Sequence, residues 1–276
     1  MDLFSWPPRT QRTSSVSLPL LPDTSGRGLL LVGHGTRDTF GLEELRLVAR
    51  QAAAACREIV VEHCFLELAD PDIARGIEHC VERGVGRLIV QPLLLFAAGH
   101  AKDDIPREVQ RAKDRYPHLE ISIAPHLGCH PRLLELSELR YSEAIANRPA
   151  VPDAESLLLM VGRGSRDPEA NSQMVCFGRL RWERRRLGRV ETCFTAMTWP
   201  SLAEGLATAA KLARRRIVVQ PHLLFRGELL ARIAEETAAA AQRNAEHEWI
   251  TVSHLGPHKL LTAALLDRSG IVCDGI

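Results

Sequence analysis

Short apolar runs alternate with amphipathic stretches along most of the chain. In the first half the apolar runs predict strands at about 29–33, 59–65, 87–93 and 119–124. Apolar positions at helical spacing predict helices at about 42–57, 71–83, 105–115 and 131–147. Strands that are apolar throughout and separated by helices are typical of a parallel sheet covered on both faces. The pattern therefore predicts an α/β fold.

The second half repeats this order from 157 to about 266. An offset of 129 residues aligns VQPLLLF at 90–96 with VQPHLLF at 219–225, and VEHCF at 61–65 with VETCF at 190–194. Because chance does not hold one register over so long a stretch, the chain is an internal duplication. We predict two tandem, similar Rossmann-like lobes, each with a four-stranded parallel sheet. A ligand would bind between the lobes, at the carboxyl ends of the strands.

The same patterns divide the chain into four parts. Residues 1–27 are rich in Pro, Ser and Thr and lack apolar periodicity, which predicts a disordered tail. We assign 28–148 to a first lobe that carries the active site and the Pro-rich stretch 149–156 to a linker. Residues 157–276 then form a degenerate second repeat.

Composition excludes several classes of partner. The formal net charge is only +1, too small for the basic field of a non-specific nucleic-acid binder. No apolar run reaches the roughly 18–20 residues of a membrane span. Seven cysteines, odd in number and without a C-x-x-C pair, argue against a disulfide framework and favour the reducing cytoplasm. Nucleotide chemistry is not indicated, because both G-x-x-x-x-G-K-[ST] and G-x-G-x-x-G are absent.

Comparing the two halves isolates three residues that carry chemistry in the first half only. Arg163, Ala196 and Leu229 stand in the second half where the first has a histidine, a glutamate and a histidine. These first-half residues are His34, Glu67 and His100, each 33 positions from the next. Such spacing is about one strand–helix unit, so each residue follows a successive strand.

Residues that follow successive parallel strands emerge at one edge of the sheet, where open α/β sheets bind ligands. Two imidazoles and a carboxylate suit a divalent metal such as Fe²⁺, Co²⁺, Ni²⁺ or Zn²⁺. Taken singly, a histidine after a strand is more often a capping or packing residue, and Glu67 could simply be solvated. The joint loss of all three in the second half favours a shared function.

Other polar pairs occur in both halves and are interpreted as scaffold. HLGCH at 126–130 is answered by HLGPH at 254–258, and we expect these histidines to support the entry to the last helix of each half. Asp38 and Asp167 are interpreted as helix N-caps.

Three motifs resemble one family. VGHGTRD at 32–38, VEHCFLELADPDI at 61–73 and VQPLLLFAAGHAKDDIP at 90–106 are similar to the sirohydrochlorin chelatases, the CbiX/SirB group of class II chelatases. The resemblance covers about 29–266, and the second half resembles the degenerate half of the two-lobed members. It implies that His34 and His100 are the catalytic, metal-binding pair and that Glu67 assists them.

The resemblance implies an ATP-independent insertion of Co²⁺ or Fe²⁺, with Ni²⁺ a further candidate, into sirohydrochlorin. This octacarboxylated tetrapyrrole leads to cobalamin or siroheme, and the sequence does not choose between them. Its carboxylates call for cations, for which Arg163 and Lys102 are candidates. An iron–sulfur cluster is not implied, because the chain lacks the C-terminal cysteine motif of some long members. We expect a monomer whose two lobes face each other.

Two other functions remain open at this point. The same residues could serve a non-catalytic tetrapyrrole or metal carrier, or a metal-dependent hydrolase or lyase on a duplicated α/β scaffold. The fold alone does not decide between them.

Overall fold

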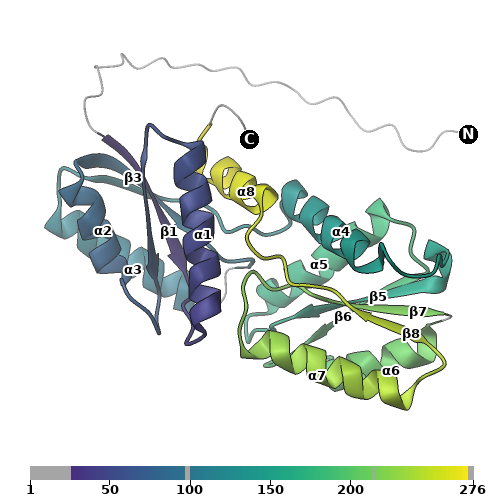
Figure 1. The fold of residues 1–276 in the computed structure, drawn as a ribbon. Helices are drawn as coiled ribbons and strands as arrows, with labels where there is room; N and C mark the ends of the chain where they lie inside the picture. The colour runs from purple at the N-terminus through teal and green to yellow at the C-terminus, as the bar shows by residue number, and fades with distance from the viewer. Residues whose placement is uncertain (1–25, 97–99, 214, 273–276) are drawn as a thin grey trace, which may run out of the picture.

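The chain folds into two α/β lobes, each built on a four-stranded sheet (Figure 1). The computed structural model describes residues 26–96, 100–213 and 215–272. The strand orders are β2-β1-β3-β4 and β6-β5-β7-β8, and all pairings are parallel. The predicted fold class is confirmed. The predicted tail, 1–27, lies outside the described residues except for Gly26 and Arg27, which begin the first strand.

Strands and helices alternate throughout both halves. The first half contains β1 (Gly26–Gly33), α1 (Thr39–Ala55), β2 (Val60–Phe65), α2 (Ile73–Glu82), β3 (Val85–Pro92), α3 (His100–Arg115), β4 (Glu120–Ile123) and α4 (Pro131–Ile145). The second contains β5 (Ser156–Gly162), α5 (Pro168–Arg184), β6 (Arg189–Phe194), α6 (Leu202–Leu212), β7 (Arg216–Pro221), α7 (Glu228–Arg243), β8 (Glu248–Thr251) and α8 (Lys259–Ser269). A short 3₁₀ turn, Asp153–Glu155, lies in the Pro-rich linker.

The central strand β1 is apolar throughout because both faces of its sheet are covered. Leu30 and Val32 pack with α2 and α3 on one face, whereas Leu29 and Leu31 belong to the cluster on the other face. Successive side chains of a strand point to opposite faces, so a strand covered on both sides has no polar face.

The carboxyl ends of neighbouring strands are level with one another. Gly33 at the end of β1 pairs with Phe65 at the end of β2. Val32 pairs with Pro92 at the end of β3. The loops that follow β1, β2 and β3 therefore start from one edge of the sheet.

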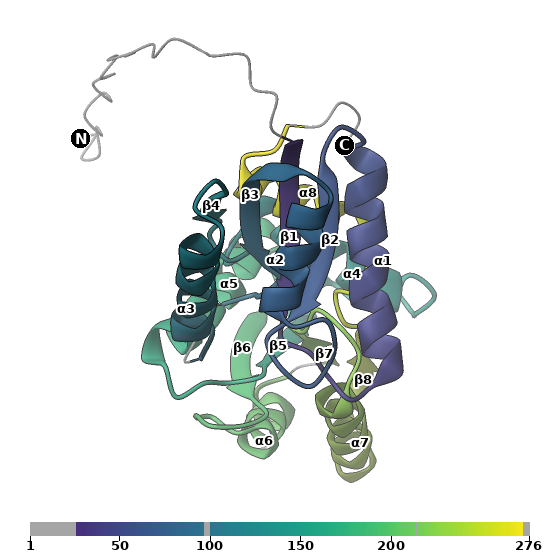
Figure 2. The same ribbon diagram turned by 90° about the vertical axis from the view of Figure 1, so that its left-hand side faces the viewer.

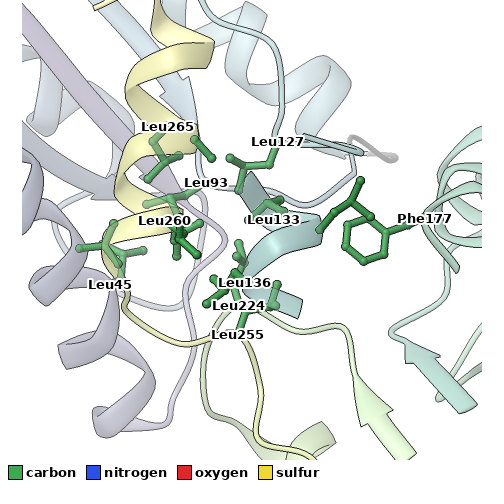
Figure 3. Close-up of a cluster of buried hydrophobic side chains, with 14 of the residues drawn as sticks. Leu45, Leu93, Leu127, Leu133, Leu136, Phe177, Leu224, Leu255, Leu260 and Leu265 are labelled. Carbon is green, nitrogen blue, oxygen red and sulfur yellow. The ribbon is translucent and has the colours of Figure 1, made fainter. Parts of the chain in front are cut away.

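The two repeats exchange their last helices. Helix α4 follows β4 of the first sheet but packs against α5 and β8, while α8 packs against α1 and β3 of the first lobe. Figure 1 shows α8 beside α1, and Figure 3 shows Leu260 of α8 beside Leu45 of α1. Buried polar contacts fix α4 on the second lobe: Gln220 Nε2 donates to the Ser137 carbonyl at 2.7 Å, and Arg181 Nε to Ser137 Oγ at 3.0 Å.

The ranges 28–148 and 157–276 thus describe sequence repeats, and each packed lobe completes its core with a helix from the other repeat. Helix α8 contacts both α1 and α4, and eight of its eleven residues are buried. A helix that is apolar on all sides needs packing partners on all sides. Truncating a buried leucine to alanine in such a position costs about 2–5 kcal/mol, so α8 stabilises the first lobe while its sequence belongs to the second repeat.

Two expectations from composition can be compared with the structure. Cys56 is disulfide-bonded, and five other described cysteines are free, so the cysteine count did not exclude an individual disulfide. Among the described residues, no helix is both long enough and apolar enough to cross a membrane.

Candidate metal-binding site at the carboxyl edge of the first sheet

His34 and Glu67 meet at the edge of the first sheet. His34 follows β1, Glu67 lies two residues after β2, and His34 Nε2 is 3.2 Å from Glu67 Oε1. Both side chains are open to solvent, with 36% of the histidine and 56% of the glutamate exposed. Two of the three residues that the repeat comparison isolated are therefore in direct contact and accessible to a ligand.

The backbone holds these two loops together beyond the strand ends. Leu66 N donates to the Gly33 carbonyl at 2.9 Å, and Glu67 N donates to the His34 carbonyl at 3.1 Å. These bonds continue the β1–β2 ladder by two residues. The imidazole and the carboxylate thus start from backbone positions that are fixed relative to each other.

Gly35 permits this close approach. Its φ is +93°, and a Cβ built on it would lie 1.8 Å from the Glu67 carbonyl oxygen. No other residue type fits there. Gly164 in the second repeat is placed in the same way, with φ +85° and a built Cβ 1.9 Å from the Ala196 carbonyl oxygen. The second repeat therefore has the same backbone at this edge, but with Arg163 and Ala196 in place of His34 and Glu67.

His100 is the first residue of α3. Residues 97–99 and the side chain of His100 lie outside the described part of the structure, so its contact with the other two is not tested. The helix begins five residues earlier than the periodicity predicted, and Pro106 lies inside it rather than in its first turn. At this position the missing N–H removes the hydrogen bond to the Lys102 carbonyl, and the proline ring crowds the same carbonyl.

The described residues do not contain a complete metal shell. No group of three or more His, Cys, Asp or Glu side chains in this part of the chain is arranged to hold a metal ion. The described donors are the pair His34 and Glu67. A carboxylate beside an imidazole can fix its tautomer and raise its basicity, or itself donate an oxygen to a metal or accept a proton.

Lys102 bridges the two lobes. Its Nζ lies 2.7 Å from Asp167 Oδ2 and 2.8 Å from Glu169 Oε2, at the start of α5. The pKa of Lys102 is raised by hydrogen bonds to Asp167 and Glu169, and the pKa of Asp167 is lowered by the same ammonium group. This lysine, predicted to bind substrate carboxylates, already has two carboxylate partners within the chain.

A second contact joins the lobes through α1. Glu44 of α1 accepts a hydrogen bond from Arg226 N at 2.7 Å, and its Oε1 lies 2.9 Å from His254 Nε2. Arg226 follows β7, so the loops at the carboxyl edge of the second sheet lie against the first lobe. Arg163, the counterpart of His34, follows β5 at this edge and is exposed.

Two of the four duplicated histidines, His130 and His258, support the entry to the last helix of each repeat as predicted, whereas His126 contacts the Leu95 carbonyl and His254 contacts Glu44. His130 Nδ1 accepts from Arg132 N at 3.3 Å and caps α4, and His258 caps α8 in the same way. Burial is the main cause that lowers the pKa of both histidines, which favours the neutral form that can accept. Asp38 and Asp167 are N-caps of α1 and α5.

The sequence reasoning missed three exposed apolar side chains in the loops after β2 and β6. Leu68, Met197 and Trp199 are 53%, 59% and 82% exposed. The repeat comparison held one signal for them, because Trp199 stands where the first repeat has Asp70. The repeat comparison gave no indication that Leu68 and Met197 have a left-handed φ, which is +64° and +65°.

The duplicated α/β fold is that of the two-lobed chelatases. The chain belongs to the CbiX family, whose model matches residues 28–144 and 157–271. It is 32% identical over 243 residues to a sirohydrochlorin cobaltochelatase of Priestia megaterium, covering 88% of this chain and 79% of the relative. It is 33% identical over 230 residues to a sirohydrochlorin ferrochelatase of the same organism, covering 83% and 84%.

Solved structures agree with this membership. The sirohydrochlorin chelatase SirB from Bacillus subtilis subspecies spizizenii, in complex with cobalt, superimposes with a TM-score of 0.75 at 28% identity. The match covers 89% of this chain and 94% of that one. The similarity therefore includes both lobes.

Proposed function

We propose that this protein is a sirohydrochlorin chelatase, which inserts Co²⁺ or Fe²⁺ into the tetrapyrrole on the way to cobalamin or siroheme. The observation that carries the proposal is the accessible His34–Glu67 pair, present at the edge of the first sheet and replaced by Arg163 and Ala196 in the second. The relatives named for both metals and the SirB likeness support it.

The reaction exchanges two pyrrole N–H protons for one divalent ion, which is a substrate. The protein must therefore hold the ion loosely and provide a base near the macrocycle. In the proposal, neutral His34 and His100 bind the incoming ion, and Glu67 orients the His34 imidazole and accepts a proton. Because the exchange needs no phosphate-bond energy, no nucleotide is required.

The first repeat supplies this chemistry, and both repeats supply contacts to the substrate. Arg163 lies exposed after β5, where a guanidinium can pair with a peripheral carboxylate of the macrocycle. Lys102 joins it by exchanging its bonds to Asp167 and Glu169 for bonds to a substrate carboxylate. Since one chain contains both sheet edges, we propose that it works as a monomer, which light scattering on the purified protein tests.

An insertion assay on the purified protein tests the function. Sirohydrochlorin is mixed anaerobically with Co²⁺ or Fe²⁺, and the change in its absorption spectrum is followed with and without protein. We expect acceleration over the protein-free rate with at least one of the two metals. A carrier would bind the tetrapyrrole without accelerating insertion, and a metal-dependent hydrolase or lyase would retain its ion through dialysis; either result would overturn the proposal.

A further inference from the structure

The loops after β2 and β6 expose apolar side chains of a size that proteins normally bury. Nine large hydrophobic side chains are exposed in the described residues, and three of them, Leu68, Met197 and Trp199, lie in these two loops. Trp199 is 82% exposed. Large exposed apolar groups that gather in one region are typical of ligand or partner sites.

These two loops share one backbone conformation. Leu68 and Met197 are equivalent in the repeat and are the two non-glycine residues with positive φ in the described chain. A left-handed conformation is unfavourable for a residue with a Cβ. In both loops it places an apolar side chain in solvent, and such strain is common at functional sites.

The two loops carry different side chains at two equivalent positions. In the first repeat the loop carries Glu67 and Asp70, and in the second the same positions carry Ala196 and Trp199. Two carboxyl groups are thus replaced by a methyl group and an indole. One loop is suited to a metal and protons, and the other to an apolar, flat surface.

Both loops border the region where the carboxyl edges of the two sheets meet. Ala196 N donates to the Arg163 carbonyl at 3.0 Å, the counterpart of the bond from Glu67 N to the His34 carbonyl. Lys102 of the first lobe reaches Asp167, which lies four residues beyond Arg163. In the view of Figure 2, the loop that joins β2 to α2 lies between the first sheet and the loop that joins β6 to α6.

We infer that Trp199 and Met197 form a platform on which one face of the tetrapyrrole stacks, while His34 and Glu67 serve the metal. This inference rests on the proposed function. A tetrapyrrole has apolar π-faces and a rim of carboxylates, so an indole stabilises its face without repelling its rim. An aspartate at this position, as in the first repeat, would repel the rim.

Substitutions at Trp199 test the platform. We compare Trp199→Ala, Trp199→Phe and Trp199→Asp with Leu212→Ala, which trims an exposed side chain at the far end of α6. The measurements are the affinity for metal-free sirohydrochlorin, by spectral titration, and the KM values for sirohydrochlorin and for Co²⁺. Thermal unfolding checks that each variant is folded.

We expect Trp199→Ala to weaken binding and to raise the sirohydrochlorin KM about tenfold, with the KM for Co²⁺ unchanged. Trp199→Phe should retain most of the affinity, Trp199→Asp should lose more than the alanine variant, and Leu212→Ala should match the wild type. If the wild type inserts metal and a folded Trp199→Ala variant has unchanged affinity and KM, the proposed platform is wrong and the proposed function stands. Failure of the wild type to insert metal would instead overturn the proposed function.

Discussion

His34 Nε2 lies 3.2 Å from Glu67 Oε1, although a complete strand–helix unit separates the two residues in the sequence. The register of two parallel strands creates this contact, because Gly33 and Phe65 pair at the last rung of the β1–β2 ladder. The same register exists in the second repeat, where Gly162 pairs with Phe194. The two ladders differ in the side chains that follow them, which are His34 and Glu67 in the first repeat and Arg163 and Ala196 in the second.

Removing either partner of this pair should impair metal insertion. We expect His34→Ala to lower kcat/KM for Co²⁺ by about 100-fold or more, because it removes a ligand. We expect Glu67→Gln to lower it by about 10–100-fold, since the amide keeps a polar contact but lacks the charge. Initial rates of insertion over a range of Co²⁺ concentrations give these values.

His79→Ala is the matched control for this prediction. His79 lies in the last turn of α2, away from the strand ends, and its loss should leave insertion unchanged. A His34→Ala variant with the wild-type rate would contradict the assignment of the site.

Gly35→Ala should disable the site without removing any of its functional side chains. The new Cβ would lie 1.8 Å from the Glu67 carbonyl oxygen, so the loop after β2 must shift. A shift of about 1 Å can cost about 100-fold in rate, and we expect a loss of this order in kcat.

Substitutions at two other glycines distinguish the clash at Gly35 from the effect of a positive φ alone and from a clash in the other lobe. Gly84 also has a positive φ, +77°, but a Cβ there meets nothing within 4 Å. Gly84→Ala should therefore cost about 1 kcal/mol of unfolding free energy and leave insertion intact. Gly164→Ala repeats the clash in the second lobe and should destabilise the protein with a smaller effect on kcat than Gly35→Ala. Equal losses of kcat in all three variants would contradict this explanation.

The sheets and the contact between His34 and Glu67 could be predicted because duplication supplies an internal comparison. Apolar runs determined the strands, and loss of His34 and Glu67 from the second repeat marked the pair that the structure brings together. The exchange of α4 and α8 could not be predicted, because an apolar helix face does not specify which sheet it covers. Trp199 was missed because its meaning depends on its exposure, which the sequence does not report.

Lys102→Met should separate a structural role of this lysine from a role in substrate binding. Lys102 and Glu169 are exposed and Asp167 is half-buried, and ion pairs that involve exposed groups contribute little to stability. We expect an almost unchanged Tm and a rise of about tenfold in the KM for sirohydrochlorin, from loss of a charge-assisted hydrogen bond. A lowered Tm with an unchanged KM would show that Lys102 only joins the lobes.

His222 should make the protein sensitive to acid. Its side chain is almost fully buried and 4.1 Å from the Phe177 ring, between centroids, and neither ring nitrogen has a hydrogen-bond partner. Burial lowers its pKa to about 3. An unfolded histidine titrates near 6.5, so below that pH the unfolded chain binds a proton that the folded chain does not. The free energy of unfolding should therefore fall with decreasing pH, from about pH 6.5 towards pH 3.

His222→Leu, which introduces the residue that the first repeat has at Leu93, should remove this component. A full shift corresponds to about 1.4 kcal/mol per pH unit, so the loss of stability between about pH 7.5 and pH 5.0 should be about 2 kcal/mol smaller in the variant. Urea unfolding at the two pH values measures the difference, and His118→Leu, at an exposed histidine, is the control. An equal pH dependence in wild type and His222→Leu would mean that the buried imidazole is protonated, or hydrated, in the folded protein.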